Sequence, residues 1–419
     1  MKILTVVYDL EIGVTQRVAQ SFALAYNELG HDSRVLAVDG LGARYEELQD
    51  CNVQVYLGLS QAIIEELREW MPELLHLHSH LLREQDVRSL VDSLTPRPVV
   101  VETNVFSKPS PWEDLLYASF QLGAWPLGLY RLRGGVDIAC VLPNAVNASG
   151  MSKAEAVVTK TFRREIDVPE DAFVLGRIGQ PYPGKWDERI VGIFDALCRG
   201  ADDCYFVCIG APDTIKDAFA KSPNIKHVRF IDRVVGDKKL SIAYSSFDVF
   251  LLAANQGESF GMVLVEAALC QVPVVTLATP WADNTQCEVV VDGESGYVNL
   301  TMGGAIRSIR KLYDSPELRR SMGVTAAKLA ERFSHIRLAN QVLQIVQNSE
   351  GTGISSDPGR GFFKWKSEEM PPLCVRLLLF IGSKTSLYMS KYVREDIGAT
   401  CMAVDLVKKA CSKIINQFR

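Results

Sequence analysis

Short apolar runs rich in β-branched residues alternate with longer amphipathic segments along most of the chain. The first run, "ILTVV", precedes a segment whose apolar residues recur on one face at the 3.6-residue period of a helix. These residues are Val18, Phe22, Ala25 and Leu29. Gly30 follows directly and is typical of the residue that ends a helix. We therefore predict a strand and then a helix at the start of the chain.

The same alternation continues to about residue 165. The further strand-like runs are "SRVLAV" (33–38), "NVQVYLG" (52–58), "LLHLHS" (74–79), "PVVVET" (98–103) and "VDIACVLPN" (136–144). Strands that alternate with helices form parallel sheets that helices cover on both faces. The pattern predicts a first doubly wound α/β domain over residues 1–165.

A second series begins after residue 166, following the stretch "FRREIDVPEDAF". Its strand-like runs are "FVLGRIG" (173–179), "CYFVCIG" (204–210), "HVRFI" (227–231), "FDVFLLA" (247–253) and "VPVVTLA" (272–278). Two successive helices are predicted over 316–348, so a second α/β domain spans 166–345. Because ligands of such sheets bind beyond the carboxyl ends of the strands, the two domains are expected to face each other across a cleft.

Residues 346–419 are predicted to be a linker and a helical tail. The stretch 351–363 is rich in Gly, Ser and Pro and is typical of a loop. Apolar positions at helical spacing over 407–418 indicate a terminal helix, which we expect to pack back on the first domain. The alternative is that the apolar run "CVRLLLFIG" (374–382) contacts a membrane surface or a partner.

Composition narrows the classes of function. The formal net charge is −5 and no basic face stands out, which argues against a general nucleic-acid binder. The ten cysteines form no C-x-x-C pair, as expected of a reduced, cytoplasmic protein. The longest apolar run, "LLLFIG" (377–382), is far shorter than the roughly 20 residues that span a bilayer.

Three familiar motifs fail on inspection. "GQPYPGK" (179–185) begins like a phosphate-binding P-loop, but Trp186 replaces the Ser or Thr that would bind magnesium, and two prolines remove N–H donors. The alternating histidines at 76, 78 and 80 share a strand face, yet no carboxylate or Cys pattern completes a metal site. No G-x-G-x-x-G follows an early strand, which argues against a nicotinamide or flavin enzyme.

The most informative residues follow two strands of the second domain. Arg177 and Lys185 lie where its first strand ends, and Ser259, Phe260 and Gly261 form the turn from a later strand into a helix. Free N–H groups and the helix dipole at such a turn favour an anion, and Gly261 would let the backbone come close to it. Two cations and oriented amides suit a leaving diphosphate without a metal ion.

Two glutamates accompany this turn. Glu266 lies in the otherwise apolar segment "MVLVEAALC", where a carboxylate is costly unless it is paired or meets a ligand. We expect Glu266 to accept hydrogen bonds from ribose hydroxyls. Glu258 precedes the turn and is expected to face the group beyond the diphosphate. The plainer alternatives are solvated charges at Arg177 and Lys185, and a Glu258 that complements a helix N-terminus.

These residues resemble a known family. "GESFGMVLVEA" (257–267) resembles the E-x(7)-E signature of the retaining glycosyltransferases of family four, which have the two-domain GT-B fold. Residues 175–197 are similar to the family's Gly-Arg…Lys strand and helix, 141–147 to its V-x-P-N-G-V segment, and 270–297 to the end of its donor site. The resemblance covers residues 1 to about 345 and implies two doubly wound, Rossmann-like domains that face a cleft.

The resemblance also implies a role for each matching residue. Arg177 and Lys185 would hold the diphosphate, Glu266 the ribose and Glu258 the transferred sugar. Backbone N–H groups would approach the sugar and the phosphate at Ser259, Phe260, Gly261 and Met262.

The chain departs from the family pattern at three places. In "EIGVTQRVAQ" (11–20), Gly13 of the expected Gly-Gly pair is kept and Val14 replaces the second glycine. The Arg-to-Lys spacing of eight is longer than usual, so Gln180 is the alternative to Arg177. A histidine expected after the fifth strand is absent. Glu102 or Asn104 stands in its place and is the candidate catalytic residue there, with a carboxylate orienting the sugar in a role different from that of the histidine.

The resulting hypothesis is a cytoplasmic or peripherally membrane-bound transferase. It would move a sugar, with retention and without metal or cofactor, from a UDP- or GDP-linked donor to a glycan, lipid or small-molecule acceptor. The alternatives are a catalytically degenerate nucleotide-sugar-binding protein, and an epimerase or phosphorylase on the same fold. The sequence predicts neither the acceptor nor the oligomeric state.

Overall fold

The computed structural model describes residues 1–347 except 137, 202, 235 and 281, and these residues form two compact units. The first unit contains Met1–Ser152, Ser259–Cys270 and residues 327–347. The second contains Lys153–Glu258 and Gln271–Ala326. Because both units draw on separate stretches of sequence, the predicted contiguous domains 1–165 and 166–345 stay predictions. The predicted tail lies outside the described residues from 348 onward.

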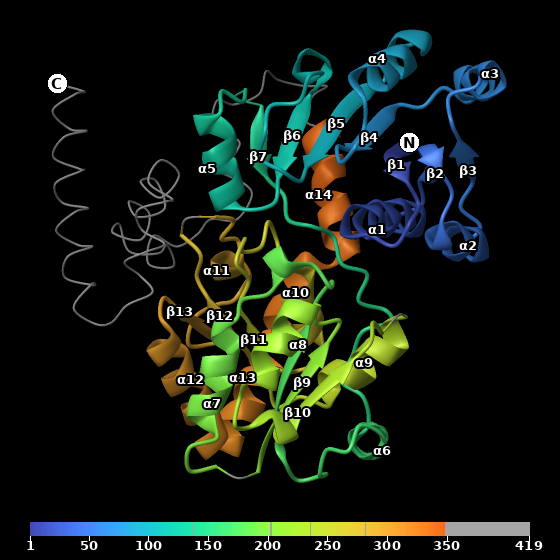
Figure 1. Ribbon diagram of the computed structural model, residues 1–419. Coiled ribbons are helices and arrows are strands. Elements are labelled where there is room, and N and C mark those ends of the chain that lie inside the picture. Colours follow the sequence, from blue (N-terminus) through green and yellow to red (C-terminus); the bar gives the residue numbers. More distant parts are fainter. Residues whose placement is uncertain (137, 202, 235, 281, 348–419) are drawn as a thin grey trace, which may run out of the picture. The chain divides into compact units, whose positions relative to one another are not determined.

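The first unit is built on a parallel sheet of seven strands in the order β3-β2-β1-β4-β5-β6-β7 (Figure 1). The strands are β1 (Lys2–Asp9), β2 (Asp32–Gly40), β3 (Val55–Leu57), β4 (Leu74–His78), β5 (Val99–Asn104), β6 (Ala118–Gln121) and β7 (Ala139–Val141). The helices are α1 (Val14–Glu28), α2 (Ala43–Asp50), α3 (Gln61–Trp70), α4 (Glu84–Ser93), α5 (Ala124–Leu132), α10 (Met262–Leu269) and α14 (His335–Gln347), with short 3-10 turns η1 (Glu113–Leu115) and η4 (Glu331–Phe333).

Helices cover both faces of this sheet. Apolar residues of β1 and β4 such as Leu4 and Leu75 pack with α3 and α4 on one face. Val7 of β1 packs with α1 and α2 on the other. Helix α1 ends as its sequence predicts, since Gly30 adopts a left-handed φ of 83° directly after the last turn.

The second unit has a parallel sheet of six strands in the order β10-β9-β8-β11-β12-β13. The strands are β8 (Phe173–Ile178), β9 (Cys204–Ile209), β10 (Val228–Ile231), β11 (Val249–Leu252), β12 (Val274–Leu277) and β13 (Gly296–Asn299). The helices are α6 (Ala156–Glu165), α7 (Arg189–Leu197), α8 (Asp213–Ala220), α9 (Asp237–Ser245), α11 (Gln286–Val289), α12 (Met302–Asp314) and most of α13 (Pro316–Ala330), with short turns η2 (Pro183–Lys185) and η3 (Ile225–His227).

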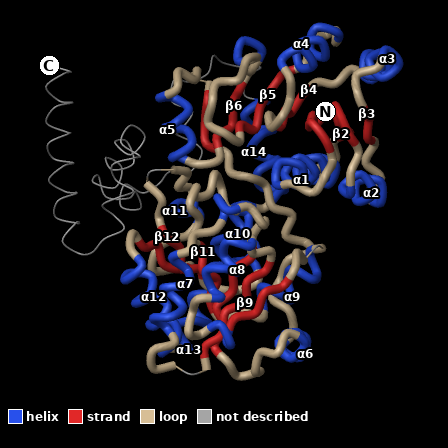
Figure 2. The backbone as a smooth tube through the Cα atoms, viewed as in Figure 1, coloured by secondary structure: helices blue, strands red, loops and turns tan. Residues whose placement is uncertain are grey.

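Both sheets share the order 3-2-1-4-5-6 over their first six strands, which is the arrangement of doubly wound nucleotide-binding folds. Figure 2 shows the alternation of strands and helices from which each unit is built. The predicted α/β class with two doubly wound, Rossmann-like units is therefore confirmed. The order reverses direction between β1 and β4 in the first unit, and between β8 and β11 in the second. Ligands of such sheets bind at these switch points.

Two strands were not predicted. β6 has the sequence "ASFQ" and β13 has "GYVN"; each is only four residues long and mixes apolar with polar residues. β6 is nevertheless fully buried because it pairs with β5 and β7. β13 pairs with β12 at the edge of the second sheet. Neighbouring strands, rather than the local pattern, give both segments their structure.

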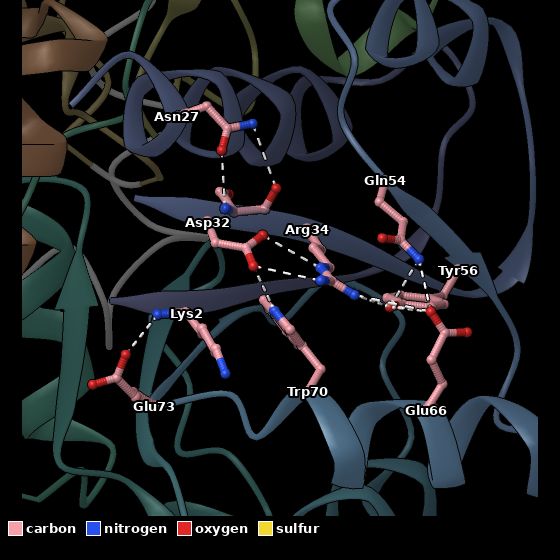
Figure 3. A network of polar contacts seen from close by, with 10 residues as sticks. Lys2, Asn27, Asp32, Arg34, Gln54, Tyr56, Glu66, Trp70 and Glu73 are labelled. Carbon is pink, nitrogen blue, oxygen red and sulfur yellow. Dashed lines mark hydrogen bonds and ion pairs between the residues drawn. The ribbon is translucent and has the colours of Figure 1, made fainter. Parts of the chain in front are cut away.

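A polar network ties the amino ends of the first unit's strands together (Figure 3). Trp70 Nε1 donates to Asp32 Oδ2 at 2.7 Å, and the Arg34 guanidinium lies 4.2 Å from the centre of the Trp70 ring. Arg34 Nη1 donates to the Tyr56 hydroxyl at 2.6 Å, and that hydroxyl donates to Glu66. The network joins α3 to β2 and β3 at the end of the sheet opposite the switch point.

Candidate functional site

The switch point of the second sheet brings Lys185 and Glu258 together. Lys185 ends the short turn η2 after β8, and Glu258 follows β11. The Lys185 Nζ and Glu258 Oε2 atoms are 2.7 Å apart, and the two side chains are 32% and 9% exposed. A lysine ammonium has three donors, and this contact uses one of them. The pair thus places a partly exposed cation where an open α/β sheet binds anionic ligands.

The loop that carries Glu258 is held by the loop after β12. Gln286 Oε1 accepts from the Glu258 backbone N–H at 3.2 Å, and the Thr285 N–H donates to the Glu258 carbonyl at 3.1 Å. Gly257 has a φ of 64°, and a Cβ there would come within 1.6 Å of the Asp283 carbonyl oxygen. Only glycine fits this close approach, so a residue with a side chain at position 257 would displace the backbone before Glu258. These contacts fix the direction from which Glu258 reaches Lys185.

Arg177 is placed differently from Lys185. Its side chain lies inside the unit, 1% exposed, with Trp186 and Phe250 rings 5.1 and 5.7 Å away. Nη1 donates to the Ile178 carbonyl at 2.8 Å and Nη2 to the Lys185 carbonyl at 2.6 Å. Burial lowers the pKa of Arg177, and the charge of Glu258 raises it in part. The described contacts make Arg177 the anchor of the loop that presents Lys185, and its contact with a diphosphate stays a prediction.

Gln180, the predicted alternative to Arg177, is exposed in the same loop. Its carbonyl accepts from Trp186 Nε1 at 2.8 Å and from the Tyr182 N–H at 2.7 Å. The side chain of Gln180 therefore stays accessible while its backbone shapes the turn. Its role toward a phosphate stays a prediction.

The turn from Ser259 to Met262 begins helix α10. Gly261 is the residue before the helix and adopts a left-handed conformation, with φ 92° and ψ 61°. Glycine has no side chain that could cap the first turn, and the predicted presentation of backbone N–H groups at this turn stays a prediction. Phe260 is buried and packs edge-on against Phe333, with ring centres 5.3 Å apart. A contact of these N–H groups with a donor stays a prediction.

Glu266 is the buried acid of α10, and it is paired with Arg17 of α1. Arg17 Nη1 lies 2.6 Å from Glu266 Oε1, and the two side chains are 17% and 6% exposed. The free-energy cost of burying a carboxylate in an apolar helix is thus offset by a cation from the same unit. The sequence pattern did not single out Arg17, although it is the Arg of the Gly-x-x-x-Arg-Val stretch that begins at Gly13.

Gly13 and Val14 stand at the start of α1. Gly13 is the N-cap in an extended conformation, and a Cβ there would meet the Gln16 side chain at 2.1 Å. Gln16 Nε2 in turn donates to Asp9 Oδ1 at 2.7 Å. Val14 is 44% exposed, so its side chain projects from the carboxyl end of β1 where the family pattern has a glycine. Whether Gly13 meets a ligand stays a prediction.

Glu102 and Asn104 are both buried in β5 of the first unit. Ser110 Oγ donates to Glu102 Oε1 at 2.5 Å, and Asn104 Nδ2 donates to the Lys108 carbonyl at 2.8 Å. Burial raises the pKa of Glu102 to about 7, and the hydrogen bond from Ser110 lowers it in part. Both side chains hold the loop that follows β5. Their predicted action on a sugar stays a prediction.

The histidines of β4 are part of the first core. His76 lies between the Tyr26 hydroxyl and the Thr103 hydroxyl, each 2.9 Å from a ring nitrogen. Burial lowers the pKa of His78 to about 3. His80 follows the strand and packs at a tilt against Phe106, with ring centres 5.2 Å apart. Among residues 1–347 with their four gaps, no group of three or more His, Cys, Asp or Glu side chains is arranged to hold a metal ion.

No helix within the described part of the chain is both long enough and apolar enough to cross a membrane.

Residues 158–329 match the family of glycosyl transferases group 1, so the match includes Arg177, Lys185, Glu258 and Glu266. A D-inositol 3-phosphate glycosyltransferase from Kineococcus radiotolerans is 25% identical over 248 residues, which are 54% of this chain and 53% of that protein. The chain thus spans about half the length of this relative. A phosphatidyl-myo-inositol mannosyltransferase from Mycobacterium leprae is 22% identical over 314 residues, or 71% of this chain and 80% of that protein.

Solved structures share the fold. A glycosyltransferase from Rickettsia africae superposes with a TM-score of 0.70 at 14% identity. The match covers 84% of this chain and 99% of that one. The Anabaena protein HepE in complex with UDP-glucose gives a TM-score of 0.65 at 16% identity, covering 83% of this chain and 100% of that one. The fold is therefore that of the GT-B glycosyltransferases, as the sequence resemblance implied. Residues 158–329 are thus similar in sequence to the glycosyl transferases group 1, and the solved structures add the fold.

Proposed function

We propose that the protein is a retaining glycosyltransferase that uses a UDP- or GDP-linked sugar and no metal ion. The observation that carries the proposal is the pair of Lys185 and Glu258, 2.7 Å apart at the switch point of the second sheet. Both residues lie in the segment that matches the glycosyl transferases group 1. A partly exposed ammonium beside a carboxylate can serve a diphosphate and a sugar hydroxyl at neighbouring positions.

The proposed roles follow the sequence resemblance. Lys185 and the N–H groups of 259–262 stabilise the charge that develops on the leaving diphosphate. Glu258 accepts from a hydroxyl of the transferred sugar, and Glu266 accepts from the ribose. The bond between the anomeric carbon and the phosphate oxygen breaks while the acceptor oxygen bonds to the same face of that carbon. A phosphate oxygen of the leaving group takes the acceptor proton.

The relatives indicate which donors and acceptors to test. HepE was solved with UDP and with UDP-glucose, which supports a uridine donor. The names of the curated relatives specify D-inositol 3-phosphate, phosphatidyl-myo-inositol and phosphatidylinositol. We therefore propose a nucleotide-sugar donor and an acceptor among glycans, lipids and small polyols, with inositol-bearing acceptors tested first.

The donor class is testable by thermal unfolding in the presence of UDP, GDP, ADP and their glucose or mannose forms, each with and without EDTA. A ligand at 100 times its Kd stabilises the folded state by about 2.7 kcal/mol, which raises the melting temperature by several degrees. We expect a rise with one base only, at the same size in EDTA. A rise that EDTA abolishes contradicts the absence of a metal ion, and no rise with any nucleotide contradicts the donor site.

Replacing the cation of the pair tests its role. We expect Lys185→Ala to weaken nucleoside diphosphate binding by at least about 1 kcal/mol, roughly fivefold in Kd, because a charge-assisted hydrogen bond is lost. Isothermal titration calorimetry measures the change. Lys216→Ala is the control, because Lys216 is a more exposed lysine of the same unit that pairs with Asp213 on α8. If Lys185→Ala binds nucleoside diphosphate as tightly as the control Lys216→Ala, Lys185 does not contact the diphosphate.

One observation favours a second candidate, a nucleotide-sugar-binding protein without transferase activity. The residues that stand where the family has a histidine, Glu102 and Asn104, are buried and hold a loop. The test is a product assay with the donor that binds and with inositol-bearing acceptors. Transfer to any of them contradicts this candidate. Donor binding with neither transfer nor hydrolysis of the donor supports it.

A further inference from the structure

Glu266 has a partner to which neither the sequence pattern nor the comparisons give a role. Arg17 Nη1 lies 2.6 Å from Glu266 Oε1 within the first unit. The carboxylate is 6% exposed and the guanidinium side chain 17%. A distance this short between a guanidinium and a carboxylate is that of a charge-assisted hydrogen bond. Arg17 is therefore bound to the acid that is proposed to read the ribose.

The position of Arg17 is fixed by the start of α1. Its N–H donates to the Gly13 carbonyl at 3.1 Å, so it belongs to the first turn of the helix that follows β1. Ser21 Oγ donates to the Arg17 carbonyl at 2.8 Å on the next turn. The guanidinium thus extends from a rigid element at the carboxyl end of the first sheet. This location is where doubly wound folds bind ligands.

The position of Glu266 is fixed by its helix. The segment "MVLVEAAL" is apolar except for this residue, and most of its side chains are buried. The two oxygens of a carboxylate can rotate about the last side-chain bond, so a fixed donor beside them restricts how the group is oriented. The planar guanidinium of Arg17 bonds one oxygen and so selects one orientation of the group.

We infer that Arg17 is a positioning residue for nucleoside recognition, which holds the Glu266 carboxylate in the orientation that accepts the ribose hydroxyls. The inference rests on the proposed function, because Glu266 reads a ribose only if the protein binds a nucleotide. Arg17 need not contact the donor. Its effect is exerted on the discrimination between a ribose and a sugar that lacks a hydroxyl.

Two simpler roles give different results. If Arg17 only ties α1 to α10, its loss weakens the fold and changes the affinity of every nucleotide alike. If Arg17 competes with the ribose for Glu266, its loss tightens nucleotide binding. A positioning role instead weakens the ribonucleotide and leaves the deoxyribonucleotide nearly unchanged. The ratio of the two dissociation constants separates these three roles.

The experiment is calorimetric titration of UDP, GDP and their 2′-deoxy forms into the full-length protein and its variants. For the base that binds, we expect the wild-type protein to prefer the ribonucleotide by at least about tenfold, the size of one hydrogen bond to a charged group. In Arg17→Ala the preference falls to within about twofold. In Arg17→Lys, which keeps the charge but not the planar fork, it falls to an intermediate value.

The controls separate positioning from folding. Arg44→Ala is matched to Arg17, because Arg44 is a helical arginine of the same unit, 13% exposed, that donates to Gln20 at 2.7 Å and pairs with Glu47. We expect Arg44→Ala to keep the full preference for the ribonucleotide. Glu266→Gln loses the preference, and adding Arg17→Ala to it changes the preference no further. If Arg17→Ala does not fold, the Arg17→Lys and Glu266→Gln pair carries the test.

Three outcomes overturn the inference. One is a full ribose preference in Arg17→Ala and Arg17→Lys, another is an equal loss of affinity for ribo- and deoxyribonucleotides, and the third is tighter binding of the ribonucleotide. Failure of the proposed function looks different, because the wild-type protein then binds none of the four nucleotides. That result removes the inference together with the function.

Discussion

Arg177→Met lowers the free energy of unfolding by about 3 kcal/mol, because it leaves the Ile178 and Lys185 carbonyls without their donor inside the second unit. Each orphaned buried carbonyl costs about 1–3 kcal/mol, and the apolar methionine recovers part of this by packing beside Trp186 and Phe250. Urea unfolding followed by tryptophan fluorescence measures this loss, and thermal unfolding should show a fall in melting temperature on the order of 10 °C.

Arg229→Met is the matched control for this prediction. Arg229 also donates to backbone carbonyls, of Ile166 and Asp167, and stacks on Tyr205, but its side chain is only half-buried. Because water can replace its hydrogen bonds, we expect a loss of about 1 kcal/mol. Similar losses in the two variants would mean that Arg177 does not anchor the loop of Lys185. A full-strength nucleotide affinity in folded Arg177→Met would separate the anchor from the predicted diphosphate contact.

Glu102→Gln changes the pH dependence of stability by about 3 kcal/mol between pH 4.5 and 7. Burial raises the pKa of Glu102 from 4.5 in the unfolded chain to about 7 in the folded one. The folded state therefore holds a proton that the unfolded state releases, and stability falls as pH rises through this window by about 1.4 kcal/mol per unit. Gln cannot ionise, so the variant gains on the wild-type protein as pH rises. Urea unfolding at half-unit pH steps measures the difference.

In the comparison between variant and wild type, the contributions of the other buried titratable groups to stability cancel. Burial also lowers the pKa of His76 and His78, so these histidines decrease stability as pH falls below 6.5, in the opposite sense to Glu102. Their contribution is the same in both proteins and cancels. Asp114→Asn is the control, because the hydrogen bond with Arg88 lowers the pKa of that exposed carboxyl and places its titration below the window. Parallel curves for Glu102→Gln and the wild type would contradict a buried, protonated Glu102.

Hydrophobic periodicity was sufficient to predict the two doubly wound units, because their central strands are nearly continuous apolar runs. It failed for β6 and β13, which are four residues long and carry polar residues. Ser119 and Gln121 of β6 are buried only because strands from other parts of the sequence pair with it on both sides. No window of local sequence contains that pairing.

For the candidate site, the sequence suggested residues but not their contacts. Spacing and family resemblance identified Lys185, Glu258 and Glu266, and the structure adds that the first two are in contact. The burial of Arg177 was not foreseen, because it depends on β8 being a central strand between β9 and β11. The pairing of Glu266 with Arg17 spans 249 positions in the sequence, which no motif spacing can predict. The only available signal was the arginine of the Gly-x-x-x-Arg-Val stretch.

The non-contiguous make-up of the first unit has a consequence for synthesis on the ribosome. Helix α14 packs against α1, His335 Nε2 lies 3.2 Å from Glu28 Oε1, and the Tyr117 hydroxyl donates to the Ile345 carbonyl at 3.4 Å. The seven strands of this unit are complete by residue 141, but its last described helix ends at Gln347. At about 5–20 residues per second, the nascent sheet waits on the order of 10–40 s for the helix that covers α1. The sheet of the first unit, although made early, therefore lacks this covering helix until residue 347 has been synthesised.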